Sequence, residues 1–323
     1  MGKIEAPTEF FVMMSGERLL LTGASGQLGS YLLRELVGSP FPVVAWSGSG
    51  NGESYGQQLV TVDLSGDAAA VEGAFRAANP DIVVHTAAVS TVAACHADPH
   101  RATRVNVDAT KHLVECADSQ RARFVLVSTD LVFDGAQGQY EEFDTPSPTS
   151  RYGQTKLDAE HLVAQSANHV ITRMSLLYGP ALNGRPAFFD KQMSAIRGKD
   201  TCSLFVDEWR TPLSFPAAAQ GLLDIARSDY TGTLHLGGPE RISRYEMGLR
   251  IARAVGLDGD NLVPARQADL ESPEPRPRDV SLNSNRWRTL FPNTPWPNLE
   301  TAISQKWRVR SEGAKGVSND GLP

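Results

Sequence analysis

A tyrosine and a lysine four residues apart, Tyr152 and Lys156, have the types and spacing needed for proton transfer. On a helix, side chains at this spacing lie on one face. A free tyrosine titrates at about pH 10, and a neighbouring ammonium favours the phenolate and lowers that pKa. Such a tyrosine can give a proton to a carbonyl oxygen or take one from an alcohol. By itself, however, the pattern is more often an ordinary surface pair.

Hydroxyl side chains stand at the end of an apolar segment that precedes this pair. The segment from Phe124 ends in Ser128 and Thr129, and its apolar character is typical of a buried strand. A hydroxyl group at this strand end could hold the same carbonyl oxygen that the tyrosine protonates. The sequence therefore indicates chemistry on a carbonyl or an alcohol.

Three glycines near the start of the chain predict an anion-binding turn. Gly23, Gly26 and Gly29 follow the apolar run Leu19–Leu21, and leucines then recur at helical spacing. Strand, glycine turn and helix are the context that a dinucleotide-binding fingerprint needs. The first glycine permits the tight turn, the second lets the backbone approach a pyrophosphate, and the third lets the helix pack closely. A tight turn without a ligand is the alternative.

The first half of the chain alternates between predicted strands and predicted helices. The apolar periodicity predicts further strands at 42–46, 59–64, 81–87, 124–129 and 170–177. It predicts helices between them at 68–78, 105–117 and 150–164. Residues 47–55 are expected to form a loop. The pattern predicts an α/β fold with a Rossmann-type, doubly wound parallel sheet.

The second half has a looser rhythm and predicts a smaller α/β substrate-binding lobe. Helices are expected at 216–226, 244–255, 284–290 and 299–307, and a strand at 232–236. The predicted division is 18–178 plus 207–237 for the nucleotide-binding domain and 179–206 plus 238–310 for the lobe. Residues 1–17 and 311–323 are expected to be flexible. Ligands should bind at the carboxyl edge of the sheet.

Bulk composition excludes several classes of protein. The net charge of −6 and the scattered basic residues argue against nucleic-acid binding. No apolar run approaches the roughly 20 residues of a membrane span. Cys95, Cys116 and Cys202 lack the spacing of metal ligands, so no metal is predicted, and they favour reduced thiols in the cytoplasm.

These stretches together resemble the extended short-chain dehydrogenase/reductases. The similarity is strongest to dTDP-4-dehydrorhamnose reductases and the related regulatory β subunits of methionine adenosyltransferase. It extends from about Arg18 to about Trp307. The matching motifs include TGASGQLG (22–29), DIVVHTAA (81–88), STDLVFDG (128–135), YGQTK (152–156) and RPRDVSLN (276–283).

The resemblance implies a role for each matching residue. Thr129, Tyr152 and Lys156 correspond to the catalytic set. The residues implied in cofactor binding are Gly23, Ser25, Gly26, Gln27, Leu28, Gly29, Ser47, Asp63, Leu64, Ala87, Ala88, Tyr152 and Lys156. Those implied at the substrate are Leu131, Arg210 and Arg276, although either arginine could instead be an ordinary surface or salt-bridge residue.

Two departures from the family pattern affect specificity. Leu131 replaces a tyrosine that is expected to border the sugar, so the identity of the substrate is open. The end of the second strand carries Ser47 and Ser49 and no acid for a ribose 2′-hydroxyl. NADP(H) is therefore favoured over NAD(H), although no Arg or Lys lies between Arg34 and Arg76.

Three functions remain in competition. The first is an NAD(P)H-dependent reductase of a nucleotide-linked 4-keto-6-deoxy sugar, with Tyr152 as proton donor, Lys156 lowering its pKa, and Thr129 orienting the carbonyl. The second is an NADP-binding regulatory subunit with little turnover. The third, an epimerase or dehydratase, is disfavoured because Asp130 is followed by Leu131 and not by a glutamate. The expected partners are a nucleotide sugar and, as one option, a second copy of the chain in a homodimer.

Overall fold

The computed structural model describes residues 16–304 with the exception of 49, 51, 199 and 270. The flexibility predicted for residues 1–15 and 311–323 lies outside these described residues. The predicted last helix begins at Leu299 and is helical as far as the description extends, to Ser304.

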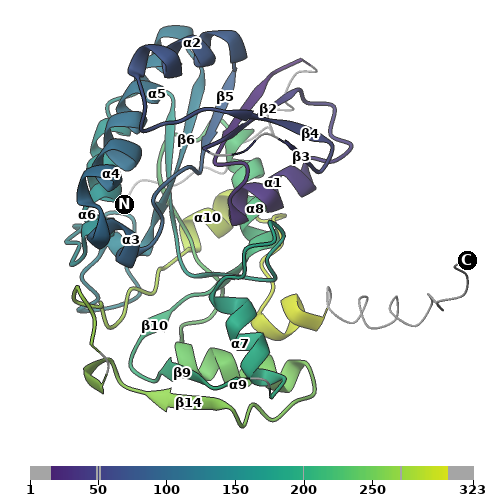
Figure 1. The fold of residues 1–323 in the computed structure, drawn as a ribbon, viewed down its shortest axis with the longest axis vertical. Coiled ribbons are helices and arrows are strands. Elements are labelled where there is room, and N and C mark those ends of the chain that lie inside the picture. Colours follow the sequence, from purple (N-terminus) through teal and green to yellow (C-terminus); the bar gives the residue numbers. More distant parts are fainter. Residues whose placement is uncertain (1–15, 49, 51, 199, 270, 305–323) are drawn as a thin grey trace, which may run out of the picture.

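An eight-stranded sheet forms the centre of the larger part of the molecule (Figure 1). All neighbouring strands pair in parallel except β3, which pairs antiparallel with β4 at the edge. In spatial order the strands are β12 (Gly232–Leu236), β7 (His169–Met174), β6 (Arg123–Thr129), β5 (Ile82–His85), β1 (Leu19–Thr22), β2 (Val43–Ser47), β4 (Gln57–Thr61) and β3 (Gly52–Ser54). The order reverses direction at β1, so the predicted doubly wound sheet is confirmed.

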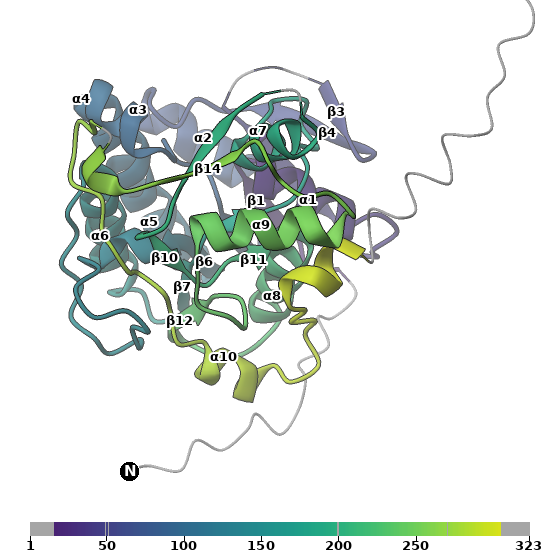
Figure 2. The same cartoon turned by 90° about the horizontal axis from the view of Figure 1, so that it is seen from below.

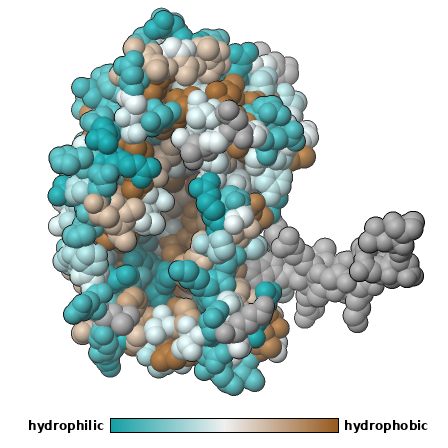
Figure 3. All heavy atoms as spheres, viewed as in Figure 1, coloured by the Kyte–Doolittle hydropathy of each residue, from teal (hydrophilic) through white to brown (hydrophobic). Residues whose placement is uncertain are grey.

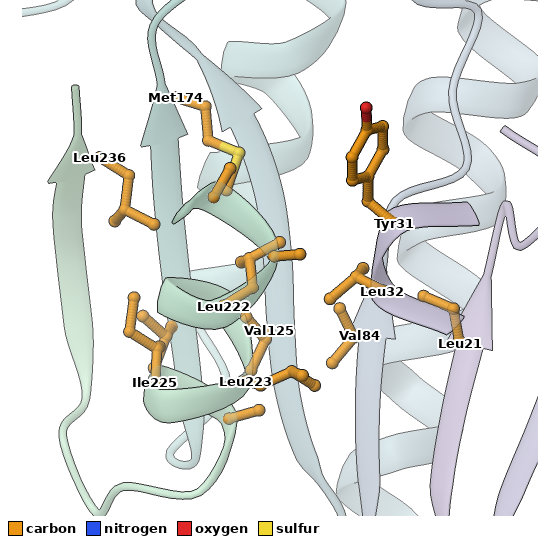
Figure 4. Close-up of a cluster of buried hydrophobic side chains, with 14 of the residues drawn as sticks. Leu21, Tyr31, Leu32, Val84, Val125, Met174, Leu222, Leu223, Ile225 and Leu236 are labelled. Atoms are coloured by element: carbon orange, nitrogen blue, oxygen red, sulfur yellow. The ribbon is translucent and has the colours of Figure 1, made fainter. Parts of the chain in front are cut away.

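Helices cover both faces of this sheet, and each face has its own apolar core. On one face α1 and α8 pack together, as Figure 4 shows for Leu32, Leu222 and Leu223 against Val84 and Val125. On the other face α2, α5 and α6 pack side by side. The bounds are α1 (Gln27–Glu35), α2 (Ala68–Ala78), α5 (Ala109–Gln120), α6 (Arg151–Val163) and α8 (Phe215–Ala226). The continuous apolar runs of the central strands are explained by this two-sided cover.

Three segments differ from the sequence prediction. The expected loop at 47–55 contains β3, because Tyr55 and Gly56 both have positive φ, 52° and 77°, and form a two-residue hairpin turn. The chain leaves the sheet after Thr61, so Asp63 and Leu64 follow β4 and are not part of it. Before α5 the chain forms α3 (Val92–Ala97), α4 (Pro99–Thr103) and a π-helical turn (Arg104–Asp108).

A smaller part with a third apolar core lies below the sheet in Figure 1 and faces the viewer in Figure 2. Its core joins α7 to α9, with β9 and β14 paired in parallel. The remaining elements are α7 (Phe188–Ile196), β8 (Leu177–Tyr178), β9 (Cys202–Phe205), β10 (Trp209–Arg210), β11 (Leu213–Ser214), β13 (Ile242–Ser243), α9 (Arg244–Ala254), β14 (Leu262–Ala265), a 3-10 turn (Gln267–Asp269) and α10 (Asn285–Leu290). The division of the chain into a nucleotide-binding domain and a smaller substrate-binding lobe remains a proposal.

A buried ion pair ties α6 to the ends of β6 and β7. Arg173 on β7 donates to both carboxylate oxygens of Glu160 on α6, at 2.8 to 3.2 Å. The hydroxyl of Ser128 on β6 donates to the same carboxylate. Both charged side chains are at most 7% exposed, so their positions depend on each other.

Removal of one member of this pair should destabilise the fold strongly. Replacement Arg173→Met leaves the Glu160 carboxylate buried without its cation, and we expect a loss of about 3 kcal/mol in the free energy of unfolding. The double variant Glu160→Met with Arg173→Met should regain most of that loss, because neither member of the pair is left as a buried charge without its partner. Urea denaturation measures both values. Equal losses in the single and double variants would contradict this account.

Candidate functional site

A cleft of about 820 Å³ opens along the carboxyl ends of β1, β2, β5 and β6. It lies on the side where the smaller part faces the sheet, and Figure 3 shows the hollowed face between them. All but one of the predicted site residues line it: Gly23, Ser25, Gly26, Gln27, Leu28, Gly29, Ser47, Asp63, Leu64, Ala87, Ala88, Thr129, Leu131, Tyr152, Lys156 and Arg210. Parallel strands place these residues together because their carboxyl ends share one edge.

The turn between β1 and α1 is packed so tightly that it accepts only glycine. Gly23 has a φ of 69°, and a Cβ there would lie 2.7 Å from the backbone nitrogen of Ala87. A Cβ at Gly29 would overlap the carbonyl oxygen of Gly23. No side chain caps the N-terminus of α1 at Gly26. The first N–H groups of α1 therefore remain available to an anion, so the turn fits a pyrophosphate.

The far end of the cleft has hydroxyl groups where a ribose-binding acid often stands. Ser47 at the end of β2 donates a hydrogen bond to the hydroxyl of Ser25 at 3.1 Å. Asp63 lies further along, and its carboxylate accepts from the backbone and side chain of Ser65 at 2.8 and 2.7 Å. These hydrogen bonds lower the pKa of Asp63. Asp63 is therefore an acceptor held in a fixed orientation.

The candidate catalytic residues meet where α6 packs on the end of β6. Ser150 caps α6 by accepting from the backbone of Gly153 at 3.2 Å. A Cβ at Gly153 would overlap the carbonyl oxygen of Leu131, so only glycine lets α6 approach this closely. Thr129 accepts from the backbone of Leu131 at 3.2 Å. The contact places the side chain of Tyr152 in the same cleft as the hydroxyl of Thr129.

Burial controls the protonation of this group. It raises the pKa of Tyr152, the negative charge of Asp130 adds to the shift, and the neighbouring Thr129 hydroxyl opposes it. The direction is opposite to the lowering that the sequence predicted from Lys156. Lys156 is only 2% exposed, and burial lowers its pKa to about 8 while Glu160 opposes the shift. Tyr152 is therefore a neutral phenol at pH 7 and can donate a proton.

A fully buried polar pair supports the cleft from behind. The side chain of Asn106, in the π-helical turn, bonds both backbone groups of Val89 and the hydroxyl of Thr155 on α6, at 2.8 to 3.1 Å. His85 bonds the hydroxyls of Thr22 and Thr110 at 2.7 and 3.0 Å, and burial lowers its pKa to about 3. All of these hydrogen bonds are within the protein, so both residues hold the strands in place.

A cluster of buried charges lies beside Thr129. Arg210 is 7% exposed and pairs with Asp130 at 3.4 Å and with Glu208 at 3.3 Å. Arg244 also lines the cleft, and burial lowers its pKa to about 10. Arg276, the remaining predicted site residue, does not line the cleft; it is half exposed and pairs with Glu208 at 3.5 Å.

Among the residues that the structure describes, no helix is long and apolar enough to cross a membrane. In the same part of the chain, no three His, Cys, Asp or Glu side chains are grouped so that they could hold a metal ion.

The sequence model of the RmlD substrate binding domain matches residues 17–307. The chain belongs to this family. The resemblance found in the sequence is thereby confirmed, and with it the α/β fold of the dTDP-4-dehydrorhamnose reductase-like group.

Curated relatives of this family include both enzymes and a regulatory protein. The probable low-salt glycan biosynthesis reductase Agl14 of Haloferax volcanii is 33% identical over 272 residues, which are 81% of this chain and 88% of that protein. Methionine adenosyltransferase 2 subunit beta of Rattus norvegicus is 28% identical and covers 92% of both chains.

Solved structures agree with the family assignment. A dTDP-4-dehydrorhamnose reductase from Clostridium acetobutylicum superposes with a TM-score of 0.79 at 26% identity, covering 91% of this chain and 99% of that one. A hypothetical dTDP-4-dehydrorhamnose reductase from Sulfolobus tokodaii gives a TM-score of 0.76 at 29% identity, covering 88% and 98%.

Several residues that line the cleft of this chain were not predicted from the sequence. Arg101, Asn183, Arg185 and Arg244 all contribute to its wall. All four come from segments outside the sheet, and no spacing rule connects them to the glycine turn. Arg244 directly follows Ser243, which caps α9. The sequence predicted the helix that begins at Arg244, but it gave no sign that this residue lines the cleft.

The lowered pKa of Lys156 predicts a pH-dependent stability of the ligand-free protein. Between about pH 8 and 10.5 the unfolded chain binds more protons than the folded one, so stability rises with pH through this window. Lys156→Met should remove the cost of burying the charge. It should stabilise the protein by about 3 kcal/mol at pH 7 and by little above pH 10.

Urea denaturation at pH 7 and pH 10 measures the two differences. Lys111→Met, at an exposed lysine on α5, serves as the control and should change stability little at either pH. A stabilisation by Lys156→Met that is the same at both pH values would show that the buried ammonium is not its cause.

Proposed function

We propose that this chain is an NADP(H)-dependent reductase of a nucleotide-linked 4-keto-6-deoxy sugar, similar to dTDP-4-dehydrorhamnose reductases. The observation that carries the proposal is the meeting of Thr129, Tyr152 and Lys156 in the same cleft as the glycine turn. A nicotinamide cofactor bound on that turn would supply the hydride for the keto carbon. The remaining chemistry, the transfer of a proton to oxygen, falls to the side chains.

Each catalytic residue has a role that fits its surroundings. Tyr152 donates its phenolic proton to the substrate oxygen, and its raised pKa keeps that proton in place until negative charge develops on the oxygen. The Thr129 hydroxyl is oriented by the backbone of Leu131 and bonds the same oxygen. Lys156 holds ribose hydroxyls and, when protonated, stabilises the tyrosinate left behind.

The sugar end of the cleft supports an anionic substrate. Arg210 and Arg244 line it, and ion pairs with Asp130 and Glu208 hold the guanidinium of Arg210 at this end of the cleft. A guanidinium suits the diphosphate of a nucleotide sugar. Arg276 would influence that diphosphate through Glu208, which it shares with Arg210. Leu131 stands where an aromatic side chain is expected, so it is proposed to set which sugar is accepted.

Known structures of the same fold support the type of cofactor. The enzyme from Bacillus anthracis was solved in complex with NADP, and Bordetella bronchiseptica WbmG was solved in complex with NAD. In this chain, the absence of an acid at Ser47 favours the phosphorylated cofactor. A cytoplasmic location and a homodimer remain predictions from the sequence.

A regulatory subunit is the second candidate. The methionine adenosyltransferase 2 subunit beta of Rattus norvegicus matches over 92% of this chain, a larger share than the 81% matched by the Haloferax reductase. A protein of this kind would bind the dinucleotide and a partner enzyme but reduce little. The two candidates therefore differ in turnover and not in fold.

Turnover with a Tyr152→Phe control tests the proposal. Oxidation of NADPH should be followed at 340 nm with a dTDP-4-keto-6-deoxyhexose as substrate. The wild type should turn over, and the phenylalanine variant should lose at least about a hundredfold in kcat because the proton donor is gone. Its dissociation constant for NADPH should stay within about threefold, since the hydroxyl contributes little to cofactor binding.

Each result points to one candidate. Tight binding of NADPH without turnover on any keto sugar would favour the regulatory candidate. Turnover that survives in Tyr152→Phe would contradict the assignment of the proton donor, even if the protein is a reductase.

A further inference from the structure

The adenosine end of the cleft lacks a cation on the elements that normally supply one. The segment between Arg34 and Arg76, which includes β2 and β4, contains no Arg or Lys. Ser47 of this segment and Ser25 of the glycine turn place a hydrogen-bonded pair of hydroxyls at this end. Two hydroxyls can bond a phosphate but cannot balance its charge, so a preference for NADP(H) needs a cation from elsewhere.

Such a cation reaches this end from the smaller part of the molecule. Arg185 lies between β8 and α7 and lines the cleft. Its Nη2 group donates to the backbone oxygen of Ser25 at 2.9 Å. Ser25 is the residue whose hydroxyl accepts from Ser47. The guanidinium therefore contacts Ser25, the residue that carries one of the two hydroxyls at this end of the cleft.

The loop that carries Arg185 is fixed at several points. Asn183 donates to the same oxygen of Ser25 at 3.2 Å and accepts from the backbone of Arg185 at 3.1 Å. Gly184 between them has a φ of 70°, a turn conformation that glycine favours. Gln27 on α1 donates to the oxygen of Pro180 at 2.7 Å. These contacts dock the loop on the glycine turn without help from the Arg185 charge.

The charge of Arg185 is free to act on a ligand. In the part of the chain that the structure describes, no carboxylate lies within 4.0 Å of its nitrogens, whereas Arg210 in the same cleft contacts two. Its side chain is exposed to the cleft and to solvent. An arginine that is not paired with an acid is suited to a phosphate.

We propose that Arg185 binds the 2′-phosphate of NADP(H), together with the hydroxyls of Ser25 and Ser47, and so sets the cofactor preference from the substrate side of the cleft. This inference rests on the proposed dinucleotide site. Cofactor preference is usually determined by a residue at the end of β2, which has no cation here. Arg185 would supply that cation from a different segment. The preference therefore depends on the loop 180–185 staying docked on the glycine turn.

Equilibrium binding tests this inference without catalysis. Dissociation constants for NADPH and NADH are measured by fluorescence titration for the wild type and for Arg185→Ala, Arg185→Lys and Arg253→Ala. Arg253 is an exposed arginine on α9 outside the cleft, so its replacement controls for net charge. Arg185→Ala should weaken NADPH about tenfold and NADH less than twofold, because only NADPH carries the 2′-phosphate. Arg185→Lys should keep most of the preference.

Competition with nucleotide fragments and the effect of salt test whether the 2′-phosphate is the group that Arg185 binds. Adenosine 2′,5′-bisphosphate should displace NADPH from the wild type better than 5′-AMP does, and this advantage should disappear in Arg185→Ala. Added salt should reduce the preference of the wild type for NADPH but leave the variant unchanged.

If Arg185→Ala lost the same affinity for NADPH as for NADH, the inference would be overturned and Arg185 would only dock the loop. An unchanged ratio of the two constants in Arg185→Ala, or a wild type that prefers NADH, would also overturn it. In each of these cases the dinucleotide site itself would stand. A wild type that binds neither dinucleotide would instead remove the proposed function, and the inference with it.

Discussion

The site depends on the close approach of the turn after β1 to the end of β5. A side chain at Gly23 would collide with the backbone of Ala87, and one at Gly29 would collide with Gly23. The approach leaves the N-terminus of α1 uncapped at the edge where β1, β5 and β6 all end. A second close contact, at Gly153, seats α6 on Leu131 and so places Tyr152 above the same edge. Backbone packing therefore brings the anion site and the proton donor into one cleft.

The electrostatic surroundings of Tyr152 favour proton donation over proton acceptance. Burial and the charge of Asp130 raise the pKa of Tyr152, so the phenol holds its proton and acts more readily as an acid than as a base. Burial also raises the pKa of Asp130, while Arg210 opposes that shift. The ion pair keeps the acid beside Thr129 without leaving an isolated buried charge. A neutral donor beside a developing alkoxide is suited to reduction of a carbonyl.

The sequence predicted those features that depend on local pattern. The glycine turn, the order of strands and helices, and the pairing of Tyr152 with Lys156 follow from periodicity and spacing. The hairpin at β3 was missed because Tyr55 adopts a positive φ that its residue type does not suggest. Arg185 and the position of Arg276 depend on contacts between distant segments. The pKa of Tyr152 was predicted in the wrong direction, since burial outweighs the effect of a neighbour on the same helix.

The central claim is that the cleft holds a dinucleotide and a keto sugar so that reduction takes place between them. Its most direct test is transfer of deuterium from NADPH labelled at both C4 positions of the nicotinamide, with a dTDP-4-keto-6-deoxyhexose as acceptor. The account predicts a reduced sugar with one deuterium on the former keto carbon and one equivalent of NADP⁺. Recovery of the keto sugar unchanged, with the labelled cofactor bound but not oxidised, would contradict it and favour a binding protein.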